Sequence, residues 1–300
     1  MPRYPLSGRT VVITGSTGGL GSALCLALRA KGARLALLDL DLQAVTKQAA
    51  SFGGNSDARG WPVDVRSLAS VEAAMAAAAR HFGRIDIVIA NAGVESLAPL
   101  ASIDPAAFER VIDINLNGVF RTFRAGLPYV EAQQGYLLAI SSMAAFVHSP
   151  LQGAYTASKA GVWAMCDSVR LEVRHLDVGV GSVHPTFFRT PMSDAMATDP
   201  AGKVLWGGNE RGLWKMVSLD RVVAGIVRGI ERRAQFIVVP WWHRPIAWAP
   251  GHFRRWIEWI GLRRAKVREA VALAMPSSGG LKDAPATGAR TPDRNNANMN

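Results

Sequence analysis

The chain has 300 residues, of which 49% are hydrophobic, and a formal net charge of +11 at pH 7. This composition can bury a large core, as one large α/β domain or two small ones, and it excludes a chain that is disordered throughout. The charge is uneven, because residues 1–202 hold 17 Lys/Arg and 16 Asp/Glu whereas residues 203–300 hold 17 and 7. A basic C-terminal region therefore follows a near-neutral body.

The N-terminal residues lack the apolar stretch of a signal peptide, and no uncharged apolar run is long enough to span a bilayer. Cys25 and Cys166 stand in apolar, helix-like sequence, with no His or further Cys at a ligand spacing. We therefore expect buried, inert thiols in a reducing compartment and no metal site. These features predict a cytoplasmic protein, with peripheral membrane association as an open alternative.

The first predicted strand, Thr10–Thr14, is short and β-branched, as buried parallel strands are. It runs into the glycine-rich turn at residues 14–21, and an apolar helical pattern follows to about residue 30. Glycine lets the backbone approach a pyrophosphate closely, and a helix N-terminus offers free N–H groups. The placement of the turn between a strand and a helix therefore predicts a dinucleotide phosphate site.

The second predicted strand, residues 34–38, ends at Asp39, which is 18 residues after Gly21. At this distance an acidic side chain meets the ribose hydroxyls of a dinucleotide, where it attracts a 2′-hydroxyl and repels a 2′-phosphate. No Lys or Arg lies in the glycine turn or directly after Asp39. We therefore expect NAD rather than NADP, the alternative being that Asp39 is a solvated acid at a strand end.

Five more strand patterns follow, at residues 59–63, 85–90, 135–140, 178–183 and 235–239. Helical patterns separate or flank them at residues 45–52, 71–81, 108–127, 153–176 and 219–232. This alternation predicts an α/β fold, a doubly wound Rossmann-type parallel sheet of seven strands with helices on both faces. Ligands bind at the carboxyl ends of such strands, and Asp64, Asn91, Ser142 and Pro185 all follow a predicted strand.

Tyr155 and Lys159 stand four residues apart, which places both on one face of the predicted helix at 153–176. An ammonium beside a phenol favours the phenolate, so we expect Lys159 to lower the pKa of Tyr155 from about 10 towards neutrality. Such a Tyr performs general acid–base catalysis, and Ser142 can hydrogen-bond the reacting oxygen. Taken alone, the pair is common and favours two ordinary residues on a helix surface, so its assignment depends on the other motifs.

Taken together, these motifs resemble the short-chain dehydrogenase/reductase family, in its standard-length branch. The turn Thr14-Gly15-x-x-x-Gly19-x-Gly21 matches the family's cofactor loop, and Asn91-Ala92-Gly93 matches its motif after the fourth strand. The family's four catalytic positions are occupied by Asn115, Ser142, Tyr155 and Lys159. The resemblance covers about residues 7–240, a single catalytic domain, and the motifs are specific as an ordered set.

The resemblance implies a role for each of these residues. Tyr155 is the general acid/base, and Lys159 lowers its pKa and holds the nicotinamide ribose. Ser142 positions the substrate oxygen, and Asn115 holds a water in the proton relay behind Lys159. The implied cofactor site consists of Gly15, Ser16, Thr17, Gly19, Leu20, Gly21, Asp39, Asp64, Val65, Asn91, Ala92, Gly93, Tyr155, Lys159, Pro185 and Thr190.

Within that site, the resemblance places Asp64 and Val65 around the adenine, residues 91–93 along the riboses and Thr190 at the nicotinamide carboxamide. The family usually has Pro-Gly after the sixth strand, whereas here Thr186 follows the proline. A Cβ restricts the backbone at this point, which puts details of the loop at 186–190 in doubt. Ser141 is expected to be structural, because its neighbour Ser142 has the family's 13-residue separation from Tyr155.

Residues 191–218 stand where the family forms its substrate lid. This segment carries the large apolar residues Met192, Met196, Leu205, Trp206, Leu213, Trp214 and Met216. Such a lid suits a lipophilic alcohol or ketone of the steroid, retinoid or long-chain type, although core packing explains some of these residues equally well. Phe146, Val147 and His148 are expected on the opposite wall, and His148 as an additional base is a minor alternative. The expected reaction is hydride transfer to or from nicotinamide C4, with a proton passing through Tyr155.

Residues 241–275 form a basic extension in which tryptophans are interleaved with arginines, and a helix is expected over residues 253–274. Both side chains suit a membrane interface; packing over the substrate cleft and an oligomer contact are the alternatives. Nucleic-acid binding is not expected, because no recognised reading module accompanies the basic residues. Residues 276–300 are rich in Ser, Gly, Pro and Asn and are expected to be disordered.

Two alternative functions are considered. A non-catalytic dinucleotide-binding sensor or scaffold typically loses the Tyr or the Lys, and this chain keeps both. A sugar-nucleotide epimerase or dehydratase carries a different glycine spacing and a larger substrate domain. The resemblance also implies a homo-oligomer that pairs the helices at 108–127 and 153–176, unless the C-terminal extension covers that surface.

Overall fold

The computed structural model describes residues 4–190, 193–194, 198–209 and 212–275. Its centre is a parallel seven-stranded sheet in the order β3-β2-β1-β4-β5-β6-β7. The strands are β1 (Thr10–Thr14), β2 (Arg34–Asp39), β3 (Ala58–Pro62), β4 (Ile87–Ala90), β5 (Tyr136–Ile140), β6 (Gly179–Pro185) and β7 (Phe236–Val239). The predicted fold class is confirmed. The strand order reverses between β1 and β4, and this switch point is where open α/β sheets bind their ligands.

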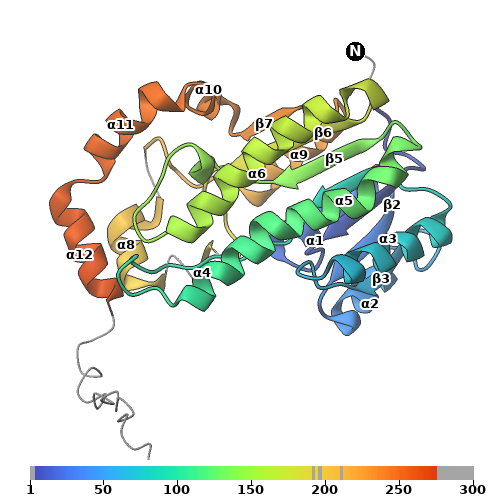
Figure 1. Ribbon diagram of the computed structural model, residues 1–300, viewed down its shortest axis with the longest axis horizontal. Coiled ribbons are helices and arrows are strands. Elements are labelled where there is room, and N and C mark those ends of the chain that lie inside the picture. Colours follow the sequence, from blue (N-terminus) through green and yellow to red (C-terminus); the bar gives the residue numbers. More distant parts are fainter. Residues whose placement is uncertain (1–3, 191–192, 195–197, 210–211, 276–300) are drawn as a thin grey trace, which may run out of the picture.

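Helices cover both faces of the sheet (Figure 1). Successive residues of a buried strand point to opposite faces, so Ile13 of β1 packs with one layer and Val12 with the other. The first layer contains α1 (Gly19–Ala30), α2 (Leu42–Ala50) and α9 (Leu219–Ile230). The second layer contains α3 (Leu68–Phe82), α5 (Gly118–Glu131) and α6 (Gly153–Glu172). Because both faces are buried, the central strands are mostly apolar, with threonine at the two ends of β1.

The helix predicted at residues 108–127 is observed as three segments, which corrects the prediction. These are α4 (Pro105–Ile112), a π-helical stretch (Asp113–Asn117) and α5. The π-helical stretch carries Asn115, whose side chain is fully buried and bonded to neighbouring elements. Such π-turns inside a helix occur frequently at functional sites, and hydrophobic periodicity does not reveal them.

The helix predicted at residues 253–274 is also interrupted. It consists of α11 (Pro250–Gly261) and α12 (Arg264–Ala274), because Leu262 and Arg263 leave the helical conformation. The break turns α12 back onto the domain, where Ala270 packs in one cluster with residues of α8 (Pro200–Trp206). Gly261 at the end of α11 is the sequence feature that agrees with this break.

We call residues 241–275 the strap. It contains a 3-10 turn (Trp241–His243), α10 (Arg244–Trp248), α11 and α12. After β7, these helices form an arc along one end of the molecule and reach α8, drawn in orange in Figure 1. In the part of the chain that the structure describes, no helix combines the length and the apolar character needed to cross a membrane. Residues 276–300, predicted to be disordered, lie outside the described residues.

Candidate active site

The glycine turn between β1 and α1 is packed against the residues that follow β4. Gly15 has a φ of +64°, and a Cβ there would lie 2.8 Å from the Cα of Ala92. A Cβ on Gly21 would overlap the carbonyl oxygen of Gly15. The Asn91 side chain holds the turn in place, because its Nδ2 donates to the carbonyl oxygens of Thr14 and Gly15, both at 2.9 Å. Only glycine fits these two positions, so the turn exposes bare backbone at the start of α1.

A cavity of about 620 Å³ lies over this turn at the carboxyl ends of the strands. We call it the loop cavity. Every residue predicted for the cofactor lines it except Ser16. Ser16 is fully buried behind the turn, where its N–H donates to Leu38 and its carbonyl oxygen accepts from Gln48. Ser16 is therefore the predicted cofactor residue that does not line the cavity, because the turn points it into the protein.

Asp39 faces the loop cavity with its carboxylate already oriented. Its Oδ2 accepts hydrogen bonds from Thr17, from the backbone N at 3.0 Å and from Oγ1 at 2.5 Å. Further along the wall, Asp64 pairs with Arg66 at 2.7 Å, and this hydrogen bond lowers the pKa of Asp64. Arg66 and Arg110 also line the cavity. The sequence reasoning missed both, because neither stands near Asp39 in the chain.

Tyr155 and Lys159 project from the first turns of α6 between the loop cavity and the end of β5. Lys159 is buried, its Nζ donates to the carbonyl oxygen of Ile140 at 2.9 Å, and it lies 5.5 Å from the centroid of the Tyr155 ring. Ser142 begins the turn after β5, where its Oγ accepts from the N–H of Ala144 at 3.1 Å. A hydrogen bond also joins the Ser142 and Tyr155 side chains. The fold thus brings the three residues together, as predicted.

The ionisation of Tyr155 depends on its burial and on Glu95. Burial raises the pKa of Tyr155 and the nearby Glu95 carboxylate raises it further, whereas the hydrogen bond with Ser142 lowers it only in part. Burial also lowers the pKa of Lys159 to about 8. Burial and Glu95 thus act against the lowering of the Tyr155 pKa that was expected from Lys159.

Asn115 lies behind Lys159 rather than in the loop cavity. Its Nδ2 donates to the carbonyl oxygen of Val94 at 2.9 Å and to Ser158 Oγ at 3.1 Å, and its Oδ1 accepts from the N–H of Val94 at 2.8 Å. The side chain therefore fixes the segment after β4 against α6. Ser141 is structural as expected, since its hydroxyl donates to the carbonyl oxygen of Lys159 at 2.9 Å.

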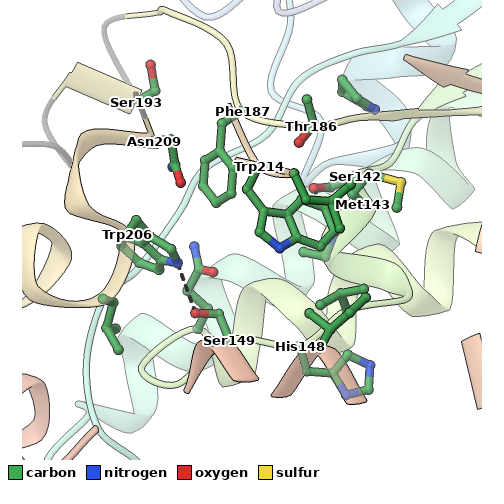
Figure 2. A pocket seen from close by; sticks show the side chains of 18 of the residues that line it. Ser142, Met143, His148, Ser149, Thr186, Phe187, Ser193, Trp206, Asn209 and Trp214 are labelled. Carbon is green, nitrogen blue, oxygen red and sulfur yellow. Dashed lines mark hydrogen bonds between the residues drawn. The ribbon is translucent and has the colours of Figure 1, made fainter. Parts of the chain in front are cut away.

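A second cavity, of about 420 Å³, meets the loop cavity at a common wall. We call it the apolar cavity. The residues that line both cavities are Tyr155, Pro185, Phe188 and Thr190. Figure 2 shows Ser142 and Met143 on one side of the apolar cavity, with Phe187, Trp206 and Trp214 also on its walls. Trp206 donates its indole N–H to Ser149 Oγ at 3.2 Å, which joins two walls.

The predicted substrate-lid residues are placed unequally. The apolar cavity is lined by Leu205, Trp206, Leu213 and Trp214, and from the opposite side by Val147 and His148. Phe146 does not reach it, because it is buried against Trp163 and His184. Met216 is also absent from the lining. Met192 and Met196 lie outside the described residues.

Two polar residues of the apolar cavity were missed by the sequence reasoning. Glu95 and Gln152 both line it, and the Gln152 side-chain amide donates to the Glu95 carboxylate. Burial raises the pKa of Glu95 to about 7, although the Gln152 hydrogen bond and the Lys159 charge oppose this. The only signal in the sequence is their position, two residues after Gly93 and three before Tyr155. This position indicates a site residue only after the motifs that contain Gly93 and Tyr155 have been recognised.

His184 holds the turn that carries Ser142. Its ring is fully buried, with Nδ1 at 3.3 Å from the Ser142 carbonyl oxygen and Nε2 at 2.9 Å from Ser182 Oγ. Since a carbonyl oxygen can only accept, Nδ1 carries the proton. Burial lowers the pKa of His184 to about 3, so the ring is neutral and holds the turn that carries Ser142.

Thr186, which replaces the family's usual glycine, fits without backbone strain. It is not among the residues with a positive φ, and its N–H donates to the Val239 carbonyl oxygen at 2.9 Å, which extends the pairing of β6 with β7. Thr190, at the end of the same loop, lines both cavities. The replacement of glycine by Thr186 therefore does not displace Thr190 from the wall that the two cavities share.

Comparison with known proteins agrees with this geometry. Residues 9–201 match the family model described as short chain dehydrogenase. The D-threitol dehydrogenase of Mycolicibacterium smegmatis is 36% identical over 204 residues, which are 67% of this chain and 78% of that protein. The 11-beta-hydroxysteroid dehydrogenase-like 6 of Arabidopsis thaliana is 32% identical over 245 residues, which are 79% of this chain and 71% of that protein.

The fold comparison points the same way. The crystal structure of a short chain dehydrogenase/reductase from Burkholderia phymatum in complex with NAD has a TM-score of 0.73 and 23% identity, covering 86% of this chain and 96% of that one. At this identity the match supports the fold, whereas the family model supports the membership. The chain is an oxidoreductase that belongs to the short-chain dehydrogenase/reductase family.

Proposed function

We propose that the protein is an NAD-dependent alcohol dehydrogenase or ketoreductase that acts on a lipophilic substrate. The observation that carries this proposal is the position of Tyr155 on the wall shared by the loop cavity and the apolar cavity. A cofactor in one cavity and an alcohol in the other would meet at this side chain. No other tyrosine of the described residues lines either cavity.

The loop cavity fits a dinucleotide. The glycine turn at the start of α1 has no room for a Cβ at Gly15 or Gly21. Its exposed backbone N–H groups suit a pyrophosphate. The Asp39 carboxylate, held by Thr17, stands where a ribose would reach it. A carboxylate repels the extra phosphate of NADP, which supports NAD as the cofactor. When bound, this cofactor supplies the hydride acceptor or donor at its nicotinamide ring.

The side chains at the wall shared by the two cavities transfer the proton of the substrate hydroxyl. In alcohol oxidation the Tyr155 oxygen takes the proton of the substrate hydroxyl, while Ser142 Oγ orients that hydroxyl. The Lys159 ammonium, held by Ile140, stabilises the negative charge of the phenolate. Burial and Glu95 raise the pKa of Tyr155, which favours the protonated phenol that ketone reduction uses.

The lining of the apolar cavity supports a lipophilic substrate. Phe187, Leu205, Trp206 and Trp214 provide most of its large side chains, and apolar walls with few polar groups recognise apolar ligands. The relative named as a hydroxysteroid dehydrogenase-like protein aligns over 245 residues, more than the 204 of the threitol dehydrogenase. The Glu95–Gln152 pair supports a second candidate, a polyol, since it offers polar partners to a second hydroxyl group.

A substrate panel tests the proposal. The full chain is incubated with NAD and with long-chain secondary alcohols, a hydroxysteroid or D-threitol, and NADH formation is followed by absorbance. We expect kcat/KM to be highest for a lipophilic alcohol and Tyr155→Phe to lower kcat by about 10³-fold or more with NAD still bound. Tyr129→Phe, on α5 outside both cavities, serves as the matched control.

Three results would overturn parts of this proposal. Undiminished turnover in Tyr155→Phe would remove the catalytic assignment. A higher kcat/KM for D-threitol than for every lipophilic alcohol would replace the lipophilic substrate with a polyol. Absence of turnover with the whole panel, together with tight NAD binding, would favour the non-catalytic sensor or scaffold.

The homo-oligomer and the cytoplasmic location stay predictions. Phe120 on α5 and Leu171 on α6 are 50% and 60% exposed. A second copy that pairs these helices would cover both side chains, as the family resemblance implies. Analytical ultracentrifugation tests this pairing, and a monomer at all concentrations would contradict it.

A further inference from the structure

The strap forms one wall of the apolar cavity. Its helix α11 and the residues that follow contribute Ile257, Gly261, Leu262 and Lys266 to the lining. The strap is attached to the domain on both sides of this wall. In α10, Ile246 and Ala247 are buried against the cluster of Met143 and Phe146, and in α12, Ala270 is buried in the cluster that contains Leu205.

Between these attachments, α11 leaves its apolar face uncovered. None of its residues is buried, and Phe253, Trp256, Trp259 and Ile260 are 40%, 65%, 76% and 48% exposed. At 100° per residue these four side chains occupy one continuous arc of the helix, and only its edge, at Ile257, turns towards the domain. A soluble helix normally buries this arc, so α11 presents a surface that needs a partner.

Tryptophan dominates this side of the molecule. Five of the nine tryptophans of the chain lie in the strap, namely Trp241, Trp242, Trp248, Trp256 and Trp259, and all five are at least 40% exposed. The guanidinium groups of Arg221 and Arg244 lie over the rings of Trp242 and Trp248, at 4.4 Å and 4.8 Å from the ring centroids. An indole with a cation beside it is suited to the headgroup region of a bilayer, where one end is apolar and the other is wet.

The charge of the strap selects among the partners that could cover it. Seven basic side chains stand against two acidic ones, Glu258 and Glu269. Arg255 borders the apolar arc beside Trp259, and Arg263 and Arg264 follow α11 directly; all three are exposed. A second copy of the chain would bring the same positive charge against this face, whereas an anionic bilayer would compensate it. The charge therefore favours a lipid surface over self-association.

We propose that the strap docks on the surface of an anionic phospholipid bilayer, with Phe253, Trp256, Trp259 and Ile260 inserted at headgroup level. The same helix then holds the wall of the apolar cavity against the bilayer. A lipophilic substrate would reach the cavity from the lipid phase without crossing water. This last step rests on the proposed function, whereas the docking itself does not.

Vesicle co-sedimentation of the full chain, without NAD or substrate, tests the docking. We use vesicles of phosphatidylcholine and phosphatidylglycerol in equal parts, vesicles of phosphatidylcholine alone, and low and high salt. The double variant Trp256→Ser/Trp259→Ser is compared with Leu26→Ser/Leu100→Ser, which removes two other exposed apolar side chains, 65% and 88% exposed, outside the strap. A triple variant, Arg255→Ser/Arg263→Ser/Arg264→Ser, tests the charge.

We expect the native chain to sediment with the anionic vesicles and to be released by high salt. The tryptophan variant should lower the partition coefficient by about tenfold or more, the arginine variant by a similar factor at low salt only, and the leucine control by less than twofold. Because all these side chains are exposed, thermal unfolding should be unchanged, and this measurement identifies a variant that is misfolded.

Three results would overturn the docking. These are equal recovery in the supernatant with and without vesicles, unchanged binding of the tryptophan variant, and conversion of an oligomer to a monomer by that variant with no effect on vesicles, which would make a second copy the partner. Failure of the proposed function is seen separately, as absence of NADH formation in solution. Substrate delivery is then judged by whether vesicles lower KM for a lipophilic alcohol in the native chain but not in the tryptophan variant.

Discussion

The loop cavity and the apolar cavity share a wall, yet the chain builds them in different ways. The loop cavity is formed mostly by turns that directly follow strands, with Asp39, Asp64 and Asn91 each within a few residues of a strand end. The apolar cavity draws on segments from Glu95 to Lys266, including helices α8 and α11. Backbone geometry therefore determines the first cavity, whereas side-chain packing between distant segments determines the second.

This difference has a consequence for substitutions. A substitution that displaces the backbone at a strand end should abolish cofactor binding, because the sheet cannot relax around it. A changed side chain in the apolar cavity should shift substrate affinity gradually, because the surrounding segments are connected by packing. The following predictions test this comparison, beginning with the largest effect.

Gly21→Ala should cause the largest loss. The added Cβ would overlap the Gly15 carbonyl oxygen and lie 3.0 Å from Asn91 Nδ2, so the turn must open. We expect NAD affinity to fall by about 100-fold or more, as for other displaced binding groups, measured by calorimetric titration. Gly18→Ala is the matched control, because its Cβ would lie 3.4 Å from the same oxygen, an ordinary contact. Equal affinities of the two variants would show that backbone geometry does not determine the loop cavity.

Asp39→Ala should change the choice of cofactor without abolishing binding. Loss of the carboxylate removes the repulsion of a 2′-phosphate, so the ratio of kcat/KM for NAD to that for NADP should fall by about 10-fold to 100-fold. Asp41→Asn serves as the control, since Asp41 is exposed and caps α2. If the ratio is the same in Asp39→Ala and in the native chain, the preference for NAD is assigned to the wrong residue.

Trp214→Ala should affect the substrate and not the cofactor. The indole lines the apolar cavity and packs on His243 at a ring distance of 4.9 Å. Its removal should raise KM for a lipophilic alcohol by about tenfold or more, because burial of a large apolar side chain contributes about 1.5 kcal/mol or more, while KM for NAD stays unchanged. Trp248→Ala, at a 67% exposed site outside both cavities, should leave both constants unchanged in solution. A parallel rise in both KM values for Trp214→Ala would show that the two cavities are coupled.

Glu95→Gln should have the smallest effect, a shift of the pH profile. The Glu95 carboxylate raises the pKa of Tyr155, so its neutral replacement should lower that pKa. Alcohol oxidation needs the phenolate, so its rate rises with pH as Tyr155 loses its proton. This rising limb of the pH–rate profile should move to lower pH, by about half a pH unit. Gln152→Glu, which adds a negative charge at the partner position, should move the limb to higher pH. Shifts in the same direction for both variants would exclude this electrostatic cause.

The sequence was sufficient for the fold and for many of the residues that line the loop cavity. Strand–turn–helix alternation depends on local patterns, and Gly15, Asp39 and Asn91 follow strands whose ends meet at one edge of the sheet. Ser16, which does not line the cavity, is an exception with a local cause, because alternate residues of a tight turn point in opposite directions. Sequence motifs do not state which of two neighbours faces inward.

The apolar cavity could be predicted only in outline. Leu205 and Trp214 were recognised as lid residues, but Glu95 and Gln152 become neighbours only when α6 packs beside the segment after β4. The burial that raises the pKa of Tyr155 could not be predicted for the same reason, since it depends on tertiary packing and not on the four-residue spacing to Lys159. The break between α11 and α12 was missed because it depends on the docking of α12 beside α8.

The position of the strap in the chain also affects how the protein assembles during synthesis. A ribosome releases β1 through β6, with the glycine turn and Tyr155, before it synthesises Ile257 and Lys266. Domains fold as their segments emerge, so a nascent chain can complete the loop cavity while the apolar cavity still lacks a wall. During that interval the large apolar side chains around Trp206 face water, and premature termination within the strap should yield a chain that binds NAD but aggregates.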